Sequence, residues 1–285
     1  MDTITDNEST HEHIPYRSAF RSWDTRAWIR TKPHRTAVPF ERGLLFFSPD
    51  ALPSAPPGGD GPSDDNQQDV EERCIRHLQS HLAMTVPLEL GPVNDACLAL
   101  RDSAYSGWLP RQLRDDALRL YADEAGHAEM TNEMARAVER ATGIAPPTTT
   151  PPFVRCVADL VAAAGADQRD LVRFLGGVVS ETLITATLTR VPLDDRVQIA
   201  VRQLLADHAD DERRHAALFR DAFSYVWPRL APDVRRAAAL LIPRMVFAFL
   251  QLEHAELAAA AAEPTLRLFR EAGTPVPMTV STVSA

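Results

Sequence analysis

Two segments of the sequence share the pattern Asp-Glu-x-x-His: Asp123–His127 and Asp211–His215. In an α-helix each residue advances by about 100°, so side chains three positions apart lie about 60° from one another. The glutamate and the histidine of each segment can therefore bind the same metal ion. The pattern predicts two helices that each supply a carboxylate and an imidazole to one site.

The neighbours of these pairs place the acids on apolar helix faces. Leu120 is in helical register with the first pair, and Leu205 is in register with the second. Two further glutamates, Glu89 and Glu181, lie on predicted faces of the same kind. Because a buried carboxylate is costly unless it is paired or bound to a metal, these faces predict a cation between the helices.

The order of candidates along the chain is Glu, Glu-x-x-His, Glu, Glu-x-x-His on four predicted helices. This is the ligand pattern of two-metal carboxylate centres in helical bundles. His208 lies four residues before Glu212 on the same stripe and is a further candidate. Asp123 and Asp211 are predicted to accept hydrogen bonds from the ligand histidines and to fix their tautomers. The predicted metal ligands are Glu89, Glu124, His127, Glu181, His208, Glu212 and His215. By contrast, His77 and His81 have no acid in register, and we expect them to be solvated or structural.

The composition favours an all-α fold, because alanine and leucine are plentiful and β-branched runs are short. Residues 1–53 form a predicted N-terminal arm whose aromatic side chains can pack on the main body or on a partner subunit. Residues 54–68 are rich in proline, glycine and acids and predict a flexible linker, and residues 69–285 form the main domain. The predicted helices span 69–84, 88–105, 111–142, 152–164, 168–190, 194–227, 232–263 and 264–272.

Charge and cysteine usage exclude several classes of function. The net charge is −9 and basic residues are scattered, which argues against nucleic acid as a partner. Three widely spaced cysteines match neither a disulfide framework nor a thiolate zinc site. The most apolar segment, 237–250, is too short for a membrane span and contains Pro243 and Arg244. The polar amino terminus does not resemble a secretory signal, so we expect a cytoplasmic protein.

With these residues the sequence resembles the p-aminobenzoate N-oxygenase family of di-iron enzymes, in the ferritin-like superfamily, over residues 69–263. His208 is the most specific part of the resemblance. The resemblance implies a ferritin-like four-helix bundle core with additional helices, two iron ions as cofactor and O2 as co-substrate. It also implies N-oxygenation of an amine, foremost an arylamine, to a hydroxylamine, nitroso or nitro product in natural product biosynthesis. Electrons would come from a reductase or ferredoxin, and the chain would form a homodimer.

Two other functions stay open at the level of sequence. One is a di-iron enzyme that hydroxylates or oxidises carbon, and the other is a ferritin-like protein that stores iron or scavenges peroxide. The long aromatic arm favours an enzyme with a substrate pocket to close. Candidate pocket residues come from the turns next to the ligands: Asn94, Tyr121, Val178, Thr182, Thr185 and Leu205.

Overall fold

The computed structural model describes residues 15–52, 67–188, 191–250, 267 and 270. Within these residues the regular structure is helical, apart from an isolated bridge between Leu45 and Val197. The predicted all-α class is therefore confirmed. The helices of the main body are α3 (Gln67–Leu88), α4 (Asn94–Asp102), α5 (Arg111–Thr142), α6 (Pro152–Ala163), α7 (Arg169–Thr187), α8 (Ile199–Val226), α9 (Pro232–Ala239) and α10 (Ile242–Leu250).

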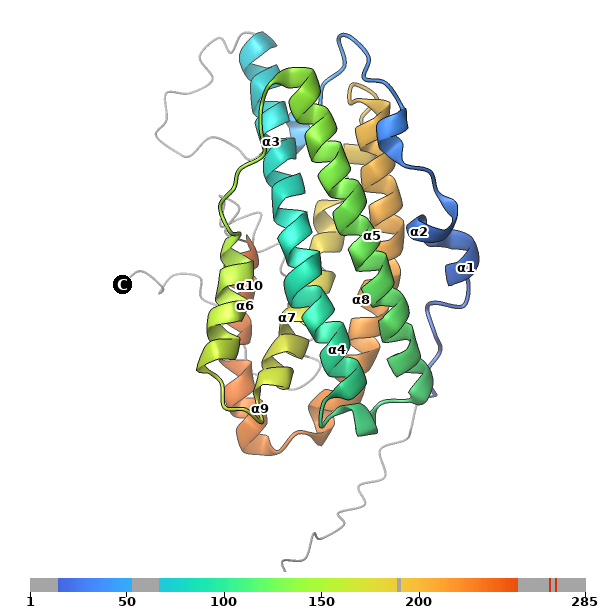
Figure 1. Ribbon diagram of the computed structural model, residues 1–285. Helices are drawn as coiled ribbons and strands as arrows, with labels where there is room; N and C mark the ends of the chain where they lie inside the picture. Colours follow the sequence, from blue (N-terminus) through green and yellow to red (C-terminus); the bar gives the residue numbers. More distant parts are fainter. Residues whose placement is uncertain (1–14, 53–66, 189–190, 251–266, 268–269, 271–285) are drawn as a thin grey trace, which may run out of the picture.

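Four long elements form the bundle that surrounds the site. They are α3 with its continuation α4, and the helices α5, α7 and α8 (Figure 1). α5 packs against α3, α4 and α8, while α7 packs against α4 and α8. α6 and α10 cover α7 from outside the bundle. The apolar stripes meet in the interior, where Leu120, Leu175 and Leu205 are almost completely buried.

The predicted break between helices at residues 84–88 is wrong. α3 continues to Leu88 and passes directly into α4 through a π-helical turn, η3 (Glu89–Val93). Proline lacks a backbone N–H and clashes with the preceding turn of an α-helix. The wider π turn holds Pro92 without ending the helix, and it carries the first predicted ligand, Glu89.

The second half of the chain also differs from the predicted helix boundaries. α8 begins at Ile199, five residues later than predicted, because 194–198 form the turn that pairs Val197 with Leu45. The predicted helix 232–263 is two helices, α9 and α10, in the part that the structure describes. Its remainder and most of the predicted helix 264–272 lie outside the described residues.

The N-terminal arm packs on the main body, along α5 and α8 (Figure 1). It contains two short helices, α1 (Trp23–Arg26) and α2 (Trp28–Thr31), and two 3-10 turns, η1 (Arg35–Ala37) and η2 (Pro49–Ala51). Phe20 and Phe47 of the arm are buried in the common hydrophobic core. All but the last two residues of the predicted linker lie outside the described residues.

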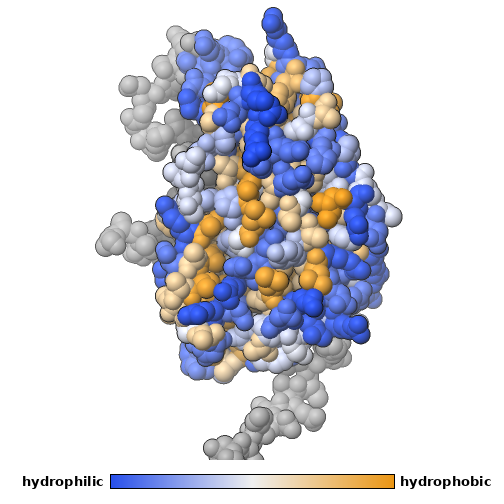
Figure 2. Space-filling view, in the orientation of Figure 1, coloured by the Kyte–Doolittle hydropathy of each residue, from blue (hydrophilic) through white to orange (hydrophobic). Residues whose placement is uncertain are grey.

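On the face built mainly by α3, α5 and α6, hydrophobic residues form separate patches among hydrophilic ones (Figure 2). None of the helices that the structure describes is long and apolar enough to cross a membrane. Cys74, Cys97 and Cys156 are free thiols; Cys74 and Cys97 are buried, and Cys156 is partly exposed.

Candidate metal centre

All seven predicted ligands lie in the bundle interior, and each is at most 1% exposed. η3, α5, α7 and α8 supply them, so the four long elements of the bundle all contribute. The ligand atoms of six of them, all but Glu181, form two groups in which every atom lies within 4.8 Å of the others. The first group is Glu89, His127, His208 and Glu212, and the second is Glu124, His127, Glu212 and His215.

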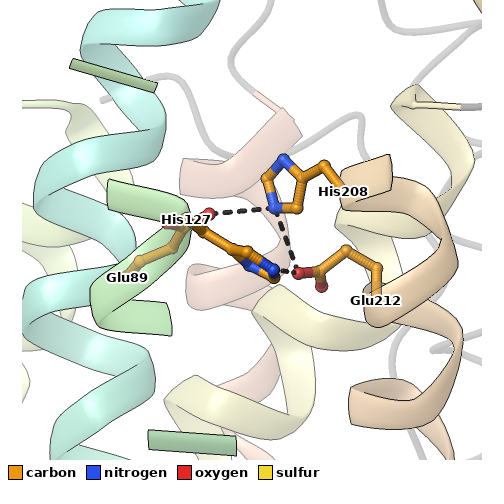
Figure 3. A group of neighbouring side chains, drawn as sticks. All are labelled: Glu89, His127, His208 and Glu212. Atoms are coloured by element: carbon orange, nitrogen blue, oxygen red, sulfur yellow. Dashed lines mark ion pairs between the residues drawn. The ribbon is translucent and has the colours of Figure 1, made fainter. Parts of the chain in front are cut away.

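The first group converges on a carboxylate oxygen of Glu212, and its side chains point toward one another (Figure 3). His208 Nε2 lies 3.0 Å from Glu89 Oε1 and 3.1 Å from Glu212 Oε1. His127 Nδ1 approaches the same Glu212 oxygen to 3.5 Å. A cation among these atoms would have two imidazole nitrogens and two carboxylates as ligands, a donor set that suits iron.

The second group lies next to the first and shares His127 and Glu212 with it. His215 Nδ1 lies 2.7 Å from Glu124 Oε1 and 3.3 Å from Glu212 Oε1. Glu181 reaches the same nitrogen at 3.6 Å through its Oε2. The two adjoining groups match the expectation of two metal positions, at which these residues would hold the ions.

The aspartate of each Asp-Glu-x-x-His motif contacts the histidine of the other motif. His127 of the first motif contacts Asp211 of the second, with 3.0 Å between Nε2 and Oδ2. His215 of the second motif contacts Asp123 of the first, with 3.2 Å between Nε2 and Oδ2. Because an aspartate accepts the proton of Nε2, the Nδ1 lone pair of each ring faces the cluster and is available to a metal.

Burial has the largest effect on the pKa of two carboxylates of the cluster, Glu89 and Glu181, whereas the histidines outweigh burial and lower the pKa of Glu124 and Glu212. Burial raises the pKa of Glu89 to about 7, although the charge of His208 acts in the opposite direction. Burial, followed by the negative charges of Glu212 and Glu124, holds the pKa of Glu181 well above its usual range. The carboxylates are thus crowded in a medium of low polarity, where a cation stabilises their charged form.

For the imidazoles, the neighbouring carboxylates outweigh the effect of burial on the pKa. Burial alone lowers the pKa of His127, but its hydrogen bond to Asp211 and the adjacent carboxylate of Glu124 outweigh burial and raise that pKa well above the usual range. The pKa of His215 is raised in the same way, against burial, by the charges of Glu124 and Glu212. Since a metal binds the neutral imidazole, metal binding must release protons from this cluster.

The donor atoms of the cluster fit a metal because their own neighbours leave them unsatisfied. Buried carboxylate oxygens and ring nitrogens nearly always have a hydrogen-bond partner in folded proteins. Here several lack one among the described residues: both oxygens of Glu89 and of Glu124, Oε2 of Glu212, Nδ1 of His127 and of His215, and Nε2 of His208. These are the atoms that a metal ion would bind.

The predicted pocket residues divide into buried and exposed ones. Val178 and Leu205 are fully buried, and Asn94 and Thr182 are 4% and 8% exposed. The Thr182 hydroxyl donates to the carbonyl of Val178, in its own helix, at 2.7 Å. Tyr121 is 38% exposed and lies on the surface, away from the cluster. The side chain of Thr185 lies outside the described residues.

The arm supplies aromatic rings that the ligand pattern did not predict. Phe20 stacks on His215, with ring centroids 6.0 Å apart. Trp28 lies against His127 at 5.6 Å and against His208 at 6.4 Å. The aromatic content of residues 1–53 indicated that the arm would pack, but sequence alone did not identify the histidines as its contacts.

His77 and His81 differ in their surroundings. The ring of His77 packs on Phe47 with 4.6 Å between centroids, a structural role as expected. Burial, and then the charge of His208, lowers the pKa of His81 to about 3. His81 is therefore a neutral, partly buried imidazole, which agrees with the expectation of a solvated or structural residue.

One comparison with known proteins gave a match. The family model described as p-aminobenzoate N-oxygenase AurF matches residues 94–268, which is more than half of the 285 residues. The matched segment contains every predicted ligand except Glu89, which precedes it by five residues. No curated protein matches the sequence.

Proposed function

Because the chain belongs to the p-aminobenzoate N-oxygenase AurF family, we propose that it is a non-haem di-iron N-oxygenase that acts on an amine, foremost an arylamine. In the first oxidation one atom of O2 joins the amine nitrogen and gives a hydroxylamine. The other atom leaves as water, and the balance needs two electrons from a donor and two protons. Further oxidation of the same nitrogen gives the nitroso and nitro products.

The observation that carries this proposal is the group of buried, unsatisfied donor atoms on three bundle elements, η3, α5 and α8. We assign both irons to the seven residues Glu89, Glu124, His127, Glu181, His208, Glu212 and His215. When bound, the irons supply the redox chemistry with O2 that no side chain provides. Four glutamates carry four negative charges, which two divalent cations balance.

The protein's own residues would select and orient the amine. Asn94 is the first residue of α4, directly after the turn that carries Glu89. Its Oδ1 is buried and accepts no hydrogen bond from the described residues, so it can accept one from an amine N–H. Val178 and Leu205 would form apolar walls. A neutral, weakly basic amine loses less hydration free energy in such surroundings than an ammonium ion does.

Two partners complete the proposal. A reductase or ferredoxin would supply the electrons, and a second copy of the chain would form a homodimer. Sedimentation velocity at micromolar concentration gives the oligomeric state. A sharp monomer peak over the accessible concentration range would remove the homodimer from the proposal without affecting the reaction.

The reaction is tested by single turnover. Iron-loaded protein is reduced without oxygen, mixed with a panel of arylamines and exposed to 18O2, and products are analysed by mass spectrometry. We expect one labelled oxygen on nitrogen in the hydroxylamine. Asn94→Ala should raise the amine concentration needed for half-maximal product while the iron content stays that of the wild type.

Other outcomes of this assay contradict the proposal. Label on carbon, with the nitrogen unchanged, would assign the protein to the hydroxylases. Oxidation and retention of iron without any organic product from the panel would assign it to iron storage. Neither result would alter the metal ligands.

A further inference from the structure

The N-terminal arm contacts both aspartates that hold the metal-centre histidines. The arm lies outside residues 94–268, the part of the chain that the family model matches. Asp123 and Asp211 are 0% exposed, so each of their oxygens needs a donor from the protein. Two tryptophans of the arm provide such donors, one through its side chain and one through its backbone.

The first contact is a hydrogen-bonded chain from Trp23 to His215. The indole Nε1 of Trp23 donates to Asp123 Oδ1 at 2.8 Å. The other oxygen of the same carboxylate faces His215 Nε2 at 3.2 Å. With one oxygen held by the indole, the carboxylate cannot rotate without breaking a charge-assisted hydrogen bond. Trp23 therefore fixes the direction in which Asp123 holds the ring of His215.

The second contact uses the backbone. Trp28 is the first residue of α2, where the N–H group has no acceptor within the helix. This N–H donates to Asp211 Oδ2 at 3.0 Å, and the same oxygen faces His127 Nε2 at 3.0 Å. Arg214 donates to the other oxygen, Oδ1. The ring of Trp28 covers His127, so the arm contacts this histidine both directly and through Asp211.

A close approach between helices places the arm at this position. Ile29 of α2 lies over Gly126, which is the residue before the ligand His127. A Cβ atom at Gly126 would overlap Cγ2 of Ile29, so with the Ile29 side chain in this position the arm can dock only on a glycine. The second motif has Arg214 at the corresponding position. The glycine in the first motif is thus explained by the arm and not by the metal.

From these contacts we propose that Trp23 and Trp28 are positioning residues of the metal centre, which orient His215 and His127 through Asp123 and Asp211. The inference rests on the proposed metal site. Its consequence is that the arm belongs to the metal-binding unit, although the residues that bind metal all lie in the bundle. Loss of the indole N–H leaves a buried carboxylate oxygen without a donor and frees the His215 ring to tilt.

The test uses the full-length protein loaded with Co²⁺, whose visible absorption reports ligand geometry. Trp23→Phe keeps an aromatic ring and removes only the N–H donor. We expect a changed cobalt spectrum and a roughly tenfold faster loss of cobalt to excess chelator, the lower end of the effect of removing a partner of a ligating histidine. Trp108→Phe is the matched control, because Trp108 packs on Tyr105 in the connection between α4 and α5.

A second pair of variants separates positioning from folding. Gly126→Ala should displace the arm and change the spectrum as Trp23→Phe does. Ile29→Ala removes the overlapping atom, so the double variant Gly126→Ala/Ile29→Ala should recover the wild-type spectrum. Wild-type spectrum and chelation rate in Trp23→Phe would overturn this inference alone. A wild-type protein that binds no cobalt would overturn both the inference and the metal site.

Discussion

The three histidines of the cluster do not present the same ring nitrogen. His127 and His215 direct Nδ1 inward because an aspartate holds Nε2 of each ring. His208 directs Nε2 inward, 3.0 Å from Glu89 and 3.1 Å from Glu212. The other six residues already match the ligand pattern of a two-metal bundle. His208 therefore adds a nitrogen donor to a site that is complete without it.

His208→Ala should keep most of its iron and lose most of its product formation. The remaining six ligands hold the metal, while the missing donor changes the electron density at one iron. Iron content and product yield in single turnover, measured on the same sample, check this. His34→Ala removes an exposed histidine that pairs with Glu133, and it should behave as the wild type does. Normal product yield in His208→Ala would contradict the assigned role.

Sequence spacing predicted the candidate ligands that the structure brings together, but not the residues that support them. Glu124 and His127 could be identified because three positions on a helix fix their relative direction. The partner of Asp123 could not, because Trp23 lies 100 residues away in the sequence and no local rule relates them. Contacts between distant segments depend on how the arm folds back, which helical periodicity does not determine.

At the scale of helices, the π turn is the element that sequence patterns did not predict. Pro87 indicated a break, since proline usually ends a helix or begins one, whereas the predicted helix 88–105 contains Pro92. The chain instead widens for one turn, which keeps α3 and α4 in line and places Glu89 in the interior. Packing of η3 against α5 and α7 stabilises this turn, and periodicity cannot reveal such tertiary contacts.

A close helix contact predicts the effect of Gly177→Ala. A Cβ at this position of α7 would lie 2.5 Å from Ala96 Cβ and 2.7 Å from the Phe219 ring. Overpacking of this kind should exceed the gain in helix propensity and lower the free energy of unfolding by about 1 to 2 kcal/mol. Urea unfolding measures the change. Gly107→Ala, which meets no atom within 4 Å, is the control. Equal stability of Gly177→Ala and wild type would contradict the packing.

The turn before α8 gives a pH-dependent prediction. Hydrogen bonds from Arg196 and Ser48 hold the pKa of Asp194 well below its usual range. A depressed pKa contributes stability above the unfolded value, about 4, and this contribution is lost as the pH falls through the folded value. Asp194→Asn should therefore lower the free energy of unfolding at pH 7 by about 1 kcal/mol, a modest value because Arg196 is half exposed and screened by solvent.

Unfolding curves from pH 7 down to pH 3 check the sign. The difference between wild type and Asp194→Asn should shrink as the pH falls below about 4, where the unfolded carboxylate becomes protonated. Asp194→Glu is the matched variant that keeps the charge. A difference that grows toward acid pH would contradict the assigned role of this carboxylate.

At the scale of the whole molecule, the fold is a helical bundle arranged around buried charge. The all-α class could be predicted from composition and periodicity, and the family match over residues 94–268 supports the same architecture. The docking of the arm along α5 and α8 could not, since an aromatic segment can pack on its own chain or on another. The structure places the arm over His215 and His127. The arm therefore contacts both helices that carry an Asp-Glu-x-x-His motif.

The most direct test of the account is the iron content of the protein after anaerobic loading with Fe²⁺ and removal of unbound metal. We predict two irons per chain, because two divalent cations balance the four buried glutamates. Glu124→Ala/Glu212→Ala removes two carboxylates of the second group and should reduce the content below one. Glu129→Ala/Glu133→Ala, which removes two acids nearer the surface of the same helix, should retain two. One metal per chain in the wild type, or an unchanged content in Glu124→Ala/Glu212→Ala, would contradict the central claim.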